Sequence, residues 1–230
     1  MGEQRGTRKM SNGKCNFCKA TFSKTTMTKH LVSCKQGRAV SETLSGKQQF
    51  KKTKAFHLVV EGRNLPEYWI HIEASADAKL EDLDGFLRDT WLECCGHLSA
   101  FRIEGKTYIS NPDEDMDDEG MDVALDDVLS PKMKFYHEYD FGTTTELILR
   151  VVSEQEGEIK GESIRLLARN DSPSITCESC GKEATKVCSQ CTYEGKGWLC
   201  DECAGAHECG EEMLLPVVNS PRVGMCGYVG

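Results

Sequence analysis

The residues best suited to chemistry are cysteines and histidines at spacings typical of metal ligands. The chain has 13 cysteines among its 230 residues. Near the N-terminus they form the pattern Cys15-x2-Cys18-x11-His30-x3-Cys34. Zinc prefers four tetrahedral nitrogen and sulfur ligands, and a helix would place His30 and Cys34 on one face. The pattern therefore predicts one zinc ion bound by these four residues.

A second, denser group of ligands lies near the C-terminus. It contains Cys177, Cys180, Cys188, Cys191, Cys200, Cys203, His207 and Cys209. Eight ligands fill two tetrahedral sites and leave no position for a catalytic water, so we expect structural ions. We favour an alternating pairing: Cys177, Cys180, Cys200 and Cys203 for one ion, and Cys188, Cys191, His207 and Cys209 for the other. Sequential pairing stays open, as does replacement of Cys209 by Cys226.

Both groups resemble known zinc modules. The first is similar to the CCHC variant of the ββα zinc finger, although its loop is one residue shorter than the usual length of about twelve. The second is similar to B-box and related cross-brace zinc modules, which usually mediate protein contacts. The 12 ligands predict three zinc ions as cofactors. A redox role of the CxxC pairs is much less favoured.

The distribution of charge points to a polyanion as a partner of the N-terminal part. Residues 1–54 hold 13 Lys and Arg and two acids, a net charge of +11, whereas residues 55–230 have a net charge of −20. Five lysines around the first zinc pattern suit phosphate contacts: Lys14, Lys19, Lys24, Lys29 and Lys35. We therefore expect weak, salt-sensitive nucleic-acid binding. A solubilising tail, or a finger that contacts only protein, explains the same charges.

Sequence-specific reading of DNA is not expected from this finger. Counted back from His30, the helix positions that would face bases are Lys29, Thr26 and Ser23. None of them is the Arg or Asn that makes bidentate contacts to a base. One finger also covers too little surface for specificity.

Residues 55–170 carry the sustained hydrophobic patterning and predict an α+β domain. Strands are expected at 56–60, 68–72, 101–103, 107–109, 134–139, 146–152 and 164–168. A stripe of leucines predicts a helix that Asp77 caps and that ends before a left-handed Gly96. Residues 123–129 predict a short helix that stops before Pro131.

The expected fold class is α+β, with a central domain flanked by small zinc-stabilised modules. The units are 1–12 (disordered), 13–35 (CCHC finger), 36–54 (basic linker), 55–170 (α+β domain) and 171–230 (double-zinc module and tail). Residues 171–230 hold few aliphatic side chains, so we expect this segment to need metal ions to fold.

Segments of the central domain and the tail resemble one family. They are 56–60 (FHLVV), 66–70 (PEYWI), 80–83 (LEDL), 97–105 (HLSAFRIEG), 139–142 (YDFG), 215–222 (LPVVNSPR) and 226–228 (CGY). Together they look like the plasmid pRiA ORF-three-like family, over residues 55–155 and the tail. The resemblance implies a prokaryotic family, found on mobile elements and chromosomes, without an established activity. Many members follow the YDFG turn with acids, a Trp and a His, where this chain has Thr143, Thr144 and Thr145. No role of that Trp or His carries over.

An enzyme built on the central domain is the less favoured alternative. Cys95, His97 and Asp140 are of the types used in nucleophilic catalysis, but no motif joins them. We expect Cys94 and Cys95 to pack at a helix end and Asp140 to form a turn. The acidic segment 113–122 is expected to be a solvated loop, because Asp118 stands where a calcium loop requires glycine.

No apolar run approaches the roughly 18 residues that a membrane helix needs. The first residues also lack the apolar stretch of a signal peptide. We therefore expect a cytoplasmic protein with no membrane partner. The predicted function is that of a non-enzymatic, zinc-binding interaction protein that touches nucleic acid through its basic end. A protein-binding adaptor without nucleic acid is the alternative.

Overall fold

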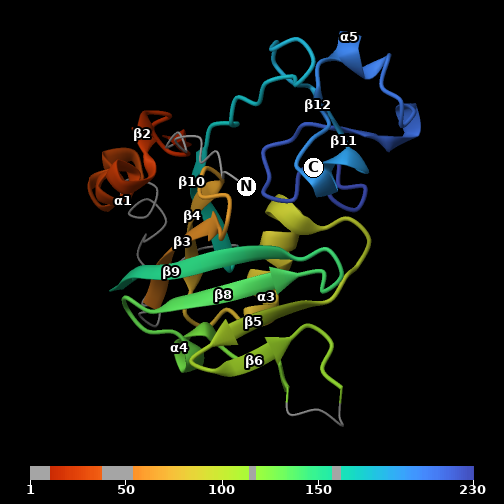
Figure 1. Cartoon of the computed structure of the whole chain (residues 1–230). Helices are drawn as coiled ribbons and strands as arrows, with labels where there is room; N and C mark the ends of the chain where they lie inside the picture. Colours follow the sequence, from red (N-terminus) through yellow and green to blue (C-terminus); the bar gives the residue numbers. More distant parts are fainter. Residues whose placement is uncertain (1–10, 38–53, 114–117, 157–161) are drawn as a thin grey trace, which may run out of the picture.

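The computed structural model describes residues 11–37, 54–113, 118–156 and 162–230. Most of its strands belong to one large sheet, and three others form a small sheet near the C-terminus (Figure 1). The large sheet is mostly antiparallel and is accompanied by few helices. The predicted α+β class is therefore confirmed.

The large sheet has the strand order β2–β1–β10–β4–β3–β9–β8–β5–β6–β7. Its strands are β1 (Asn12–Cys15), β2 (Thr21–Ser23), β3 (Lys54–Gly62), β4 (Trp69–Ser75), β5 (Ser99–Ile103), β6 (Lys106–Ile109), β7 (Glu119–Gly120), β8 (Lys134–Tyr139), β9 (Thr145–Glu156) and β10 (Ile164–Asn170). The seven strands predicted from the sequence are present as β3, β4, β5, β6, β8, β9 and β10. Strands β1 and β2 correspond to the two strands that the resemblance to a ββα finger implies, whereas the sequence does not predict β7.

Strand β3 is buried on both faces and so separates two layers of packing. Phe56 and Leu58 point to one face and belong to the main hydrophobic core. His57 and Glu61 point to the other face, where they are 1% and 5% exposed. The sheet must therefore be covered on both sides at this strand.

Helix α3 (Leu80–Leu87) covers the first of these faces. Its fully buried Leu80, Leu83 and Leu87 form the predicted stripe. The helix continues as a five-residue π-helical turn, η1 (Arg88–Leu92), which buries Trp91. A separate short helix, α4 (Leu125–Val128), ends before Pro131 as expected.

The predicted N-cap of α3 is wrong. Lys79 is the residue before the helix, and its backbone N–H donates to the Asp82 carboxylate at 2.8 Å. Asp77 instead accepts a hydrogen bond from the Ser75 hydroxyl. At the other end, Gly96 has the expected left-handed backbone, with φ of 74°.

Strands β1 and β2 and helix α1 (Lys24–Ser33) form a small unit at the edge of the large sheet, the finger unit. Strand β1 pairs antiparallel with β10, so Gly13 faces Asn170. A Cβ atom on Gly13 would overlap the Arg169 carbonyl oxygen and lie 2.6 Å from the Trp69 ring. Glycine is therefore needed where the finger unit meets the sheet.

Helix α1 belongs to the second layer, on the face of β3 that carries His57 and Glu61. Lys24, its first residue, forms an ion pair with Glu61. Arg150 of β9 pairs with the same carboxylate. Burial acts to raise the pKa of Glu61, but these two cations hold it below its ordinary value. The finger helix is thus attached to the sheet by a buried charge.

The C-terminal part contains the small sheet, with strand order β12–β11–β13. Its elements are β11 (Lys186–Cys188), η2 (Cys191–Glu194), β12 (Trp198–Leu199), α5 (Asp201–Ala204), η3 (Glu211–Met213) and β13 (Leu214–Pro216). Its own buried cluster consists of Cys177, Leu199, Cys200 and Ala204. Val187 and Val223 reach the main core of the α+β domain. Two of the four cluster residues, Cys177 and Cys200, are predicted ligands, so the aliphatic interior of this part is small.

Several expectations fall largely outside the described residues. These are the disorder of 1–12, of which only Ser11 and Asn12 are described, and most of the linker 36–54. The acidic loop is described at its two ends, outside 114–117. Among the described helices, none combines the length and the apolar composition that crossing a bilayer would require.

Candidate metal centres

The N-terminal centre brings together the four residues predicted from the sequence. Cys15 ends β1, Cys18 lies in the following turn, His30 lies in α1 and Cys34 follows it. Cys18 Sγ lies 3.2 Å from His30 Nε2, and Cys15 Sγ lies 4.0 Å from Cys34 Sγ. All four ligand atoms lie within 4.8 Å of one another. The set can hold one metal ion.

Local structure explains how this centre is positioned. Ser23 caps α1, since its hydroxyl accepts the Thr26 backbone N–H at 3.4 Å. The Phe22 ring stacks on the His30 imidazole with 4.3 Å between centroids, which orients the ring. The backbone N–H of Ala20 helps to lower the pKa of the Cys18 thiol. The turn therefore favours the thiolate that a metal requires.

The first C-terminal centre consists of Cys177, Cys180, Cys200 and Cys203. Their sulfur atoms lie within 4.8 Å of one another, and Cys180 Sγ is 3.6 Å from Cys200 Sγ. Burial acts to raise the pKa of Cys177, but backbone N–H groups led by that of Cys200 lower it to about 6. These N–H groups therefore favour the Cys177 thiolate, the form that binds a cation.

The second C-terminal centre consists of Cys188, Cys191, His207 and Cys209. Cys191 Sγ lies 3.5 Å from His207 Nε2 and 3.6 Å from Cys209 Sγ. Gly197 packs against this set: a Cβ atom there would lie 2.8 Å from Cys191 Cβ. Its φ of 92° also favours glycine. The two C-terminal sets alternate along the chain, which is the cross-brace arrangement.

A fourth set, which sequence reasoning missed, joins Cys94, Cys95, His97 and Cys226. His97 Nε2 lies 2.9 Å from Cys95 Sγ and 3.2 Å from Cys226 Sγ. Cys226 thus belongs to this set, and Cys209 completes the set of Cys188, Cys191 and His207, so replacement of Cys209 by Cys226 is wrong. Cys94 and Cys95 are also not simply packed, since Cys95 is exposed. Two features of the sequence indicate this set: the Cys-Cys-x-His spacing of residues 94–97, and Cys226, which the three predicted centres leave unassigned.

The same geometry bears on the enzyme alternative. In a catalytic Cys–His–Asp arrangement, one nitrogen of the imidazole ring faces the thiol and the other faces the carboxylate. Here Asp140 Oδ2, 3.5 Å away, faces His97 Nε2, the atom that Cys95 also faces. Asp140 is engaged elsewhere, accepting from Arg222 Nη2 at 2.7 Å. The three residues lie together but are not arranged as a catalytic triad.

The five candidate phosphate-binding lysines differ in their surroundings. Lys24 is half-buried and paired with Glu61. The others are exposed: Lys14, Lys19, Lys29 and Lys35. Lys14 lies 3.8 Å from Asp171, and this pair is exposed on both sides. Four of the five lysines are therefore accessible to a polyanion.

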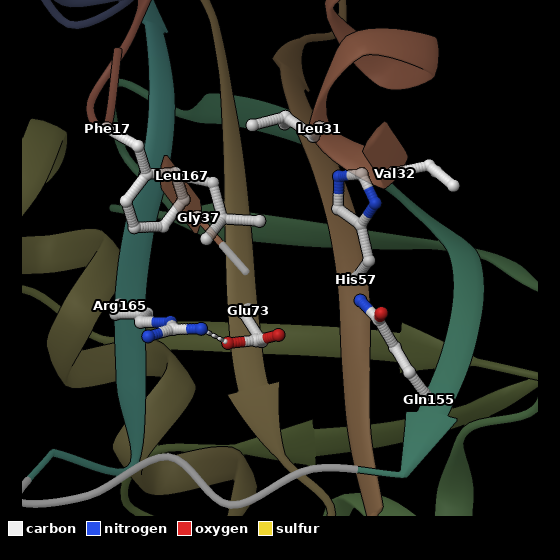
Figure 2. A pocket seen from close by; sticks show the side chains of 9 residues that line it. All are labelled: Phe17, Leu31, Val32, Gly37, His57, Glu73, Gln155, Arg165 and Leu167. Carbon is white, nitrogen blue, oxygen red and sulfur yellow. Dashed lines mark ion pairs between the residues drawn. The ribbon is translucent and has the colours of Figure 1, made fainter. Parts of the chain in front are cut away.

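A cavity of about 300 Å³ lies between the finger unit and the sheet (Figure 2). Phe17, Leu31 and Val32 line it from the finger unit, and Figure 2 shows His57 pointing from β3 toward Leu31 and Val32. On its floor Arg165 and Glu73 form an ion pair at 2.5 Å. The charges of Arg165 and Glu73 neutralise each other. This pair therefore offers no unpaired charge to a ligand in the cavity.

Comparisons with known proteins found a distant structural similarity and no family. No protein-family model matches this chain, and no curated protein has significant similarity to it. Among solved structures, the chain is similar to MM3350, a protein of unknown function from Methanosarcina mazei Go1. The two share 16% sequence identity and a TM-score of 0.44, over 57% of this chain and 76% of the other.

Proposed function

We propose that this chain is a non-enzymatic, zinc-binding interaction protein of the plasmid pRiA ORF-three-like family. Three zinc ions occupy the N-terminal centre and the two C-terminal centres. The observation that supports this most strongly is that, in each centre, the four ligand atoms lie within 4.8 Å of one another. All 13 cysteines are free, so none of these thiols is consumed in a disulfide. Free thiols in this number also favour a reducing compartment such as the cytoplasm.

The proposed partner is nucleic acid, contacted through its phosphates. Four exposed lysines of the finger unit make the contacts: Lys14, Lys19, Lys29 and Lys35. Lys24 is excluded because it is half-buried and already paired with Glu61 within the protein. Phosphate contacts carry no sequence information, which agrees with the poor base-reading positions of α1. Binding is therefore weak, sequence-independent and sensitive to salt.

A mobility-shift titration with mixed-sequence DNA and RNA tests this proposal. Four phosphate contacts predict about a 100-fold loss of affinity between about 50 and about 200 mM salt. Changing the four exposed finger lysines to Glu abolishes the shift at low salt. The matched control changes Lys106, Lys134, Lys182 and Lys196 to Glu, because these are exposed lysines elsewhere on the molecule. This control has the same net charge and keeps the shift.

A protein-binding adaptor is the second candidate, and the docking of α1 favours it. The Ser23 and Thr26 hydroxyls lie 3.0 Å apart and engage each other, and Lys24 is held by Glu61. The side of the helix that would enter a groove of DNA is thus partly occupied. The cross-brace part also exposes Tyr193, which is 63% accessible. Absence of any shift even at low salt rejects nucleic acid and leaves this candidate.

A further inference from the structure

We propose that Cys94, Cys95, His97 and Cys226 bind a fourth zinc ion, which fastens the C-terminal tail to the α+β domain. The proposal goes beyond the three centres of the proposed function. It concerns residues from two distant parts of the chain: the turn after α3 and η1, and the last five residues. Three thiols and one imidazole are a complete ligand set for a structural zinc ion.

The distances within this set fit a tetrahedral ion. With Zn–S of about 2.3 Å and Zn–N of about 2.0 Å, ligand atoms lie about 3.8 Å apart between sulfurs and about 3.5 Å between sulfur and nitrogen. Cys94 Sγ lies 3.6 Å from Cys95 Sγ, which lies 3.8 Å from Cys226 Sγ. His97 Nε2 lies 3.2 Å from Cys226 Sγ. Cys95 Sγ and His97 Nε2 are closer, at 2.9 Å, while the other separations lie in the range of the other three centres, 3.2–4.0 Å.

The backbone is shaped to bring the ligands together. Gly96 lies between Cys95 and His97 with φ of 74°, and its N–H donates to Glu93 Oε1 at 2.5 Å. This turn directs both side chains to one point. Cys226 has φ of 46°, a left-handed conformation that is uncommon outside glycine. Such strain persists where the surroundings require it, and it is often found at functional sites.

A buried cation, Arg222, lies beside this ligand set. Zinc with three thiolates carries a net charge of −1, and three thiol protons are released to solvent on binding. The Arg222 guanidinium is fully buried, and its Nη2 donates to Cys94 Sγ at 3.4 Å. The same guanidinium binds Asp140 at 2.7 Å and lies over the Tyr139 ring, 4.7 Å from its centroid. A buried cation at a ligand sulfur is the kind of outer contact that metal centres use.

The tail is already docked along the path that leads to this site. The Ser220 hydroxyl donates to the Trp91 carbonyl at 2.6 Å. Asn219 and Asn170 form two hydrogen bonds, of 2.8 and 2.9 Å. Cys226 lies 131 residues from Cys95, so an ion that joins them closes a long loop. Occupancy of the site thus controls how firmly the tail covers the end of α3 and η1.

Zinc content of the purified, reduced, fully loaded chain tests the proposal. We expect four zinc ions in the unmodified chain and three in Cys226→Ser and in Cys95→Ser. Val229→Ser is the matched control, since Val229 is an exposed residue of the same tail, and it keeps four. Cys209→Ser is a positive control that removes a C-terminal centre.

Two readouts separate loss of the ion from loss of the fold. Circular dichroism of Cys226→Ser is expected to be unchanged, because Cys226 is exposed and close to the C-terminus. Amide hydrogen exchange at residues 219–228 is expected to become at least tenfold faster in both cysteine variants. Three ions in the unmodified chain overturn the fourth site and leave the proposed function intact. An unchanged zinc content in Cys226→Ser, or a Cys95–Cys226 disulfide in its place, overturns it as well.

Discussion

Two histidines face each other inside the molecule, on neighbouring strands β3 and β4. His57 Nε2 lies 2.9 Å from His71 Nδ1, and the residues are 1% and 0% exposed. Burial lowers the pKa of His57 to about 4. Burial, together with the neighbouring His57, lowers the pKa of His71 to about 3. Both rings are therefore neutral at pH 7, with one donating a hydrogen bond to the other.

This pair predicts a loss of stability in mild acid. An unfolded histidine has a pKa near 6.5, so below that pH the unfolded chain binds protons that the folded chain excludes. The contribution of the two neutral histidines to the free energy of unfolding is fully present above pH 6.5 and is lost as the pH falls toward 4. For His57 alone the free energy of unfolding decreases by about 3 kcal/mol over this range.

Urea unfolding of the unmodified chain and of His57→Gln, measured at several pH values, checks this prediction. Glutamine keeps a polar partner for His71 but does not titrate. The variant should therefore lose less stability between pH 6.5 and 4. Acid also weakens metal binding, but it does so in both proteins, so their difference isolates the histidine. Equal pH dependence in the two proteins would contradict the assignment.

At the scale of elements, the attachment of the finger unit depends on the pairing of β1 with β10. Gly13, in β1, lies against the Arg169 backbone and the Trp69 ring. Trp69 also packs with Cys15 and Met27, which form the interior of the finger unit. The finger unit therefore shares its core with the sheet.

Gly13→Ala is expected to loosen this attachment. The added methyl group has no free space, and overpacking of this kind destabilises by about 1–3 kcal/mol. Hydrogen exchange at residues 12–34 should accelerate, while exchange in β8 and β9 stays slow. Gly120→Ala is the matched control, because its Cβ would meet only Pro112, at 3.5 Å. Equal exchange in both variants would show that Gly13 is not required for the docking.

Most elements of the central domain could be predicted from the sequence, because their signals are local. Short runs of apolar and aromatic residues mark β3 and β8, and the leucine stripe marks α3. The N-cap of α3 could not be predicted. It depends on whether the Asp77 carboxylate accepts a hydrogen bond from the helix backbone or, as observed, from the Ser75 hydroxyl. Pairing of β1 with β10 depends on residues about 155 positions apart, such as Gly13 and Asn170, and no local pattern encodes it.

At the scale of the whole molecule, the basic finger unit and the cysteine-rich C-terminal part both attach to one central sheet. The ligand spacings within each part were visible in the sequence because CxxC pairs are local. The fourth set was not, since Cys226 meets Cys95 only after the tail has folded back onto the α+β domain. Long-range contacts of this kind need the structure.

The central claim is that bound metal ions stabilise the finger unit and the C-terminal part of this protein. Native mass spectrometry of the full reduced chain tests it most directly. The predicted mass is that of the chain with four zinc ions: three in the proposed centres and one under the tail. Chelation should remove them and increase hydrogen exchange first in residues 171–230. A fully loaded chain that carries two zinc ions or fewer would contradict the account.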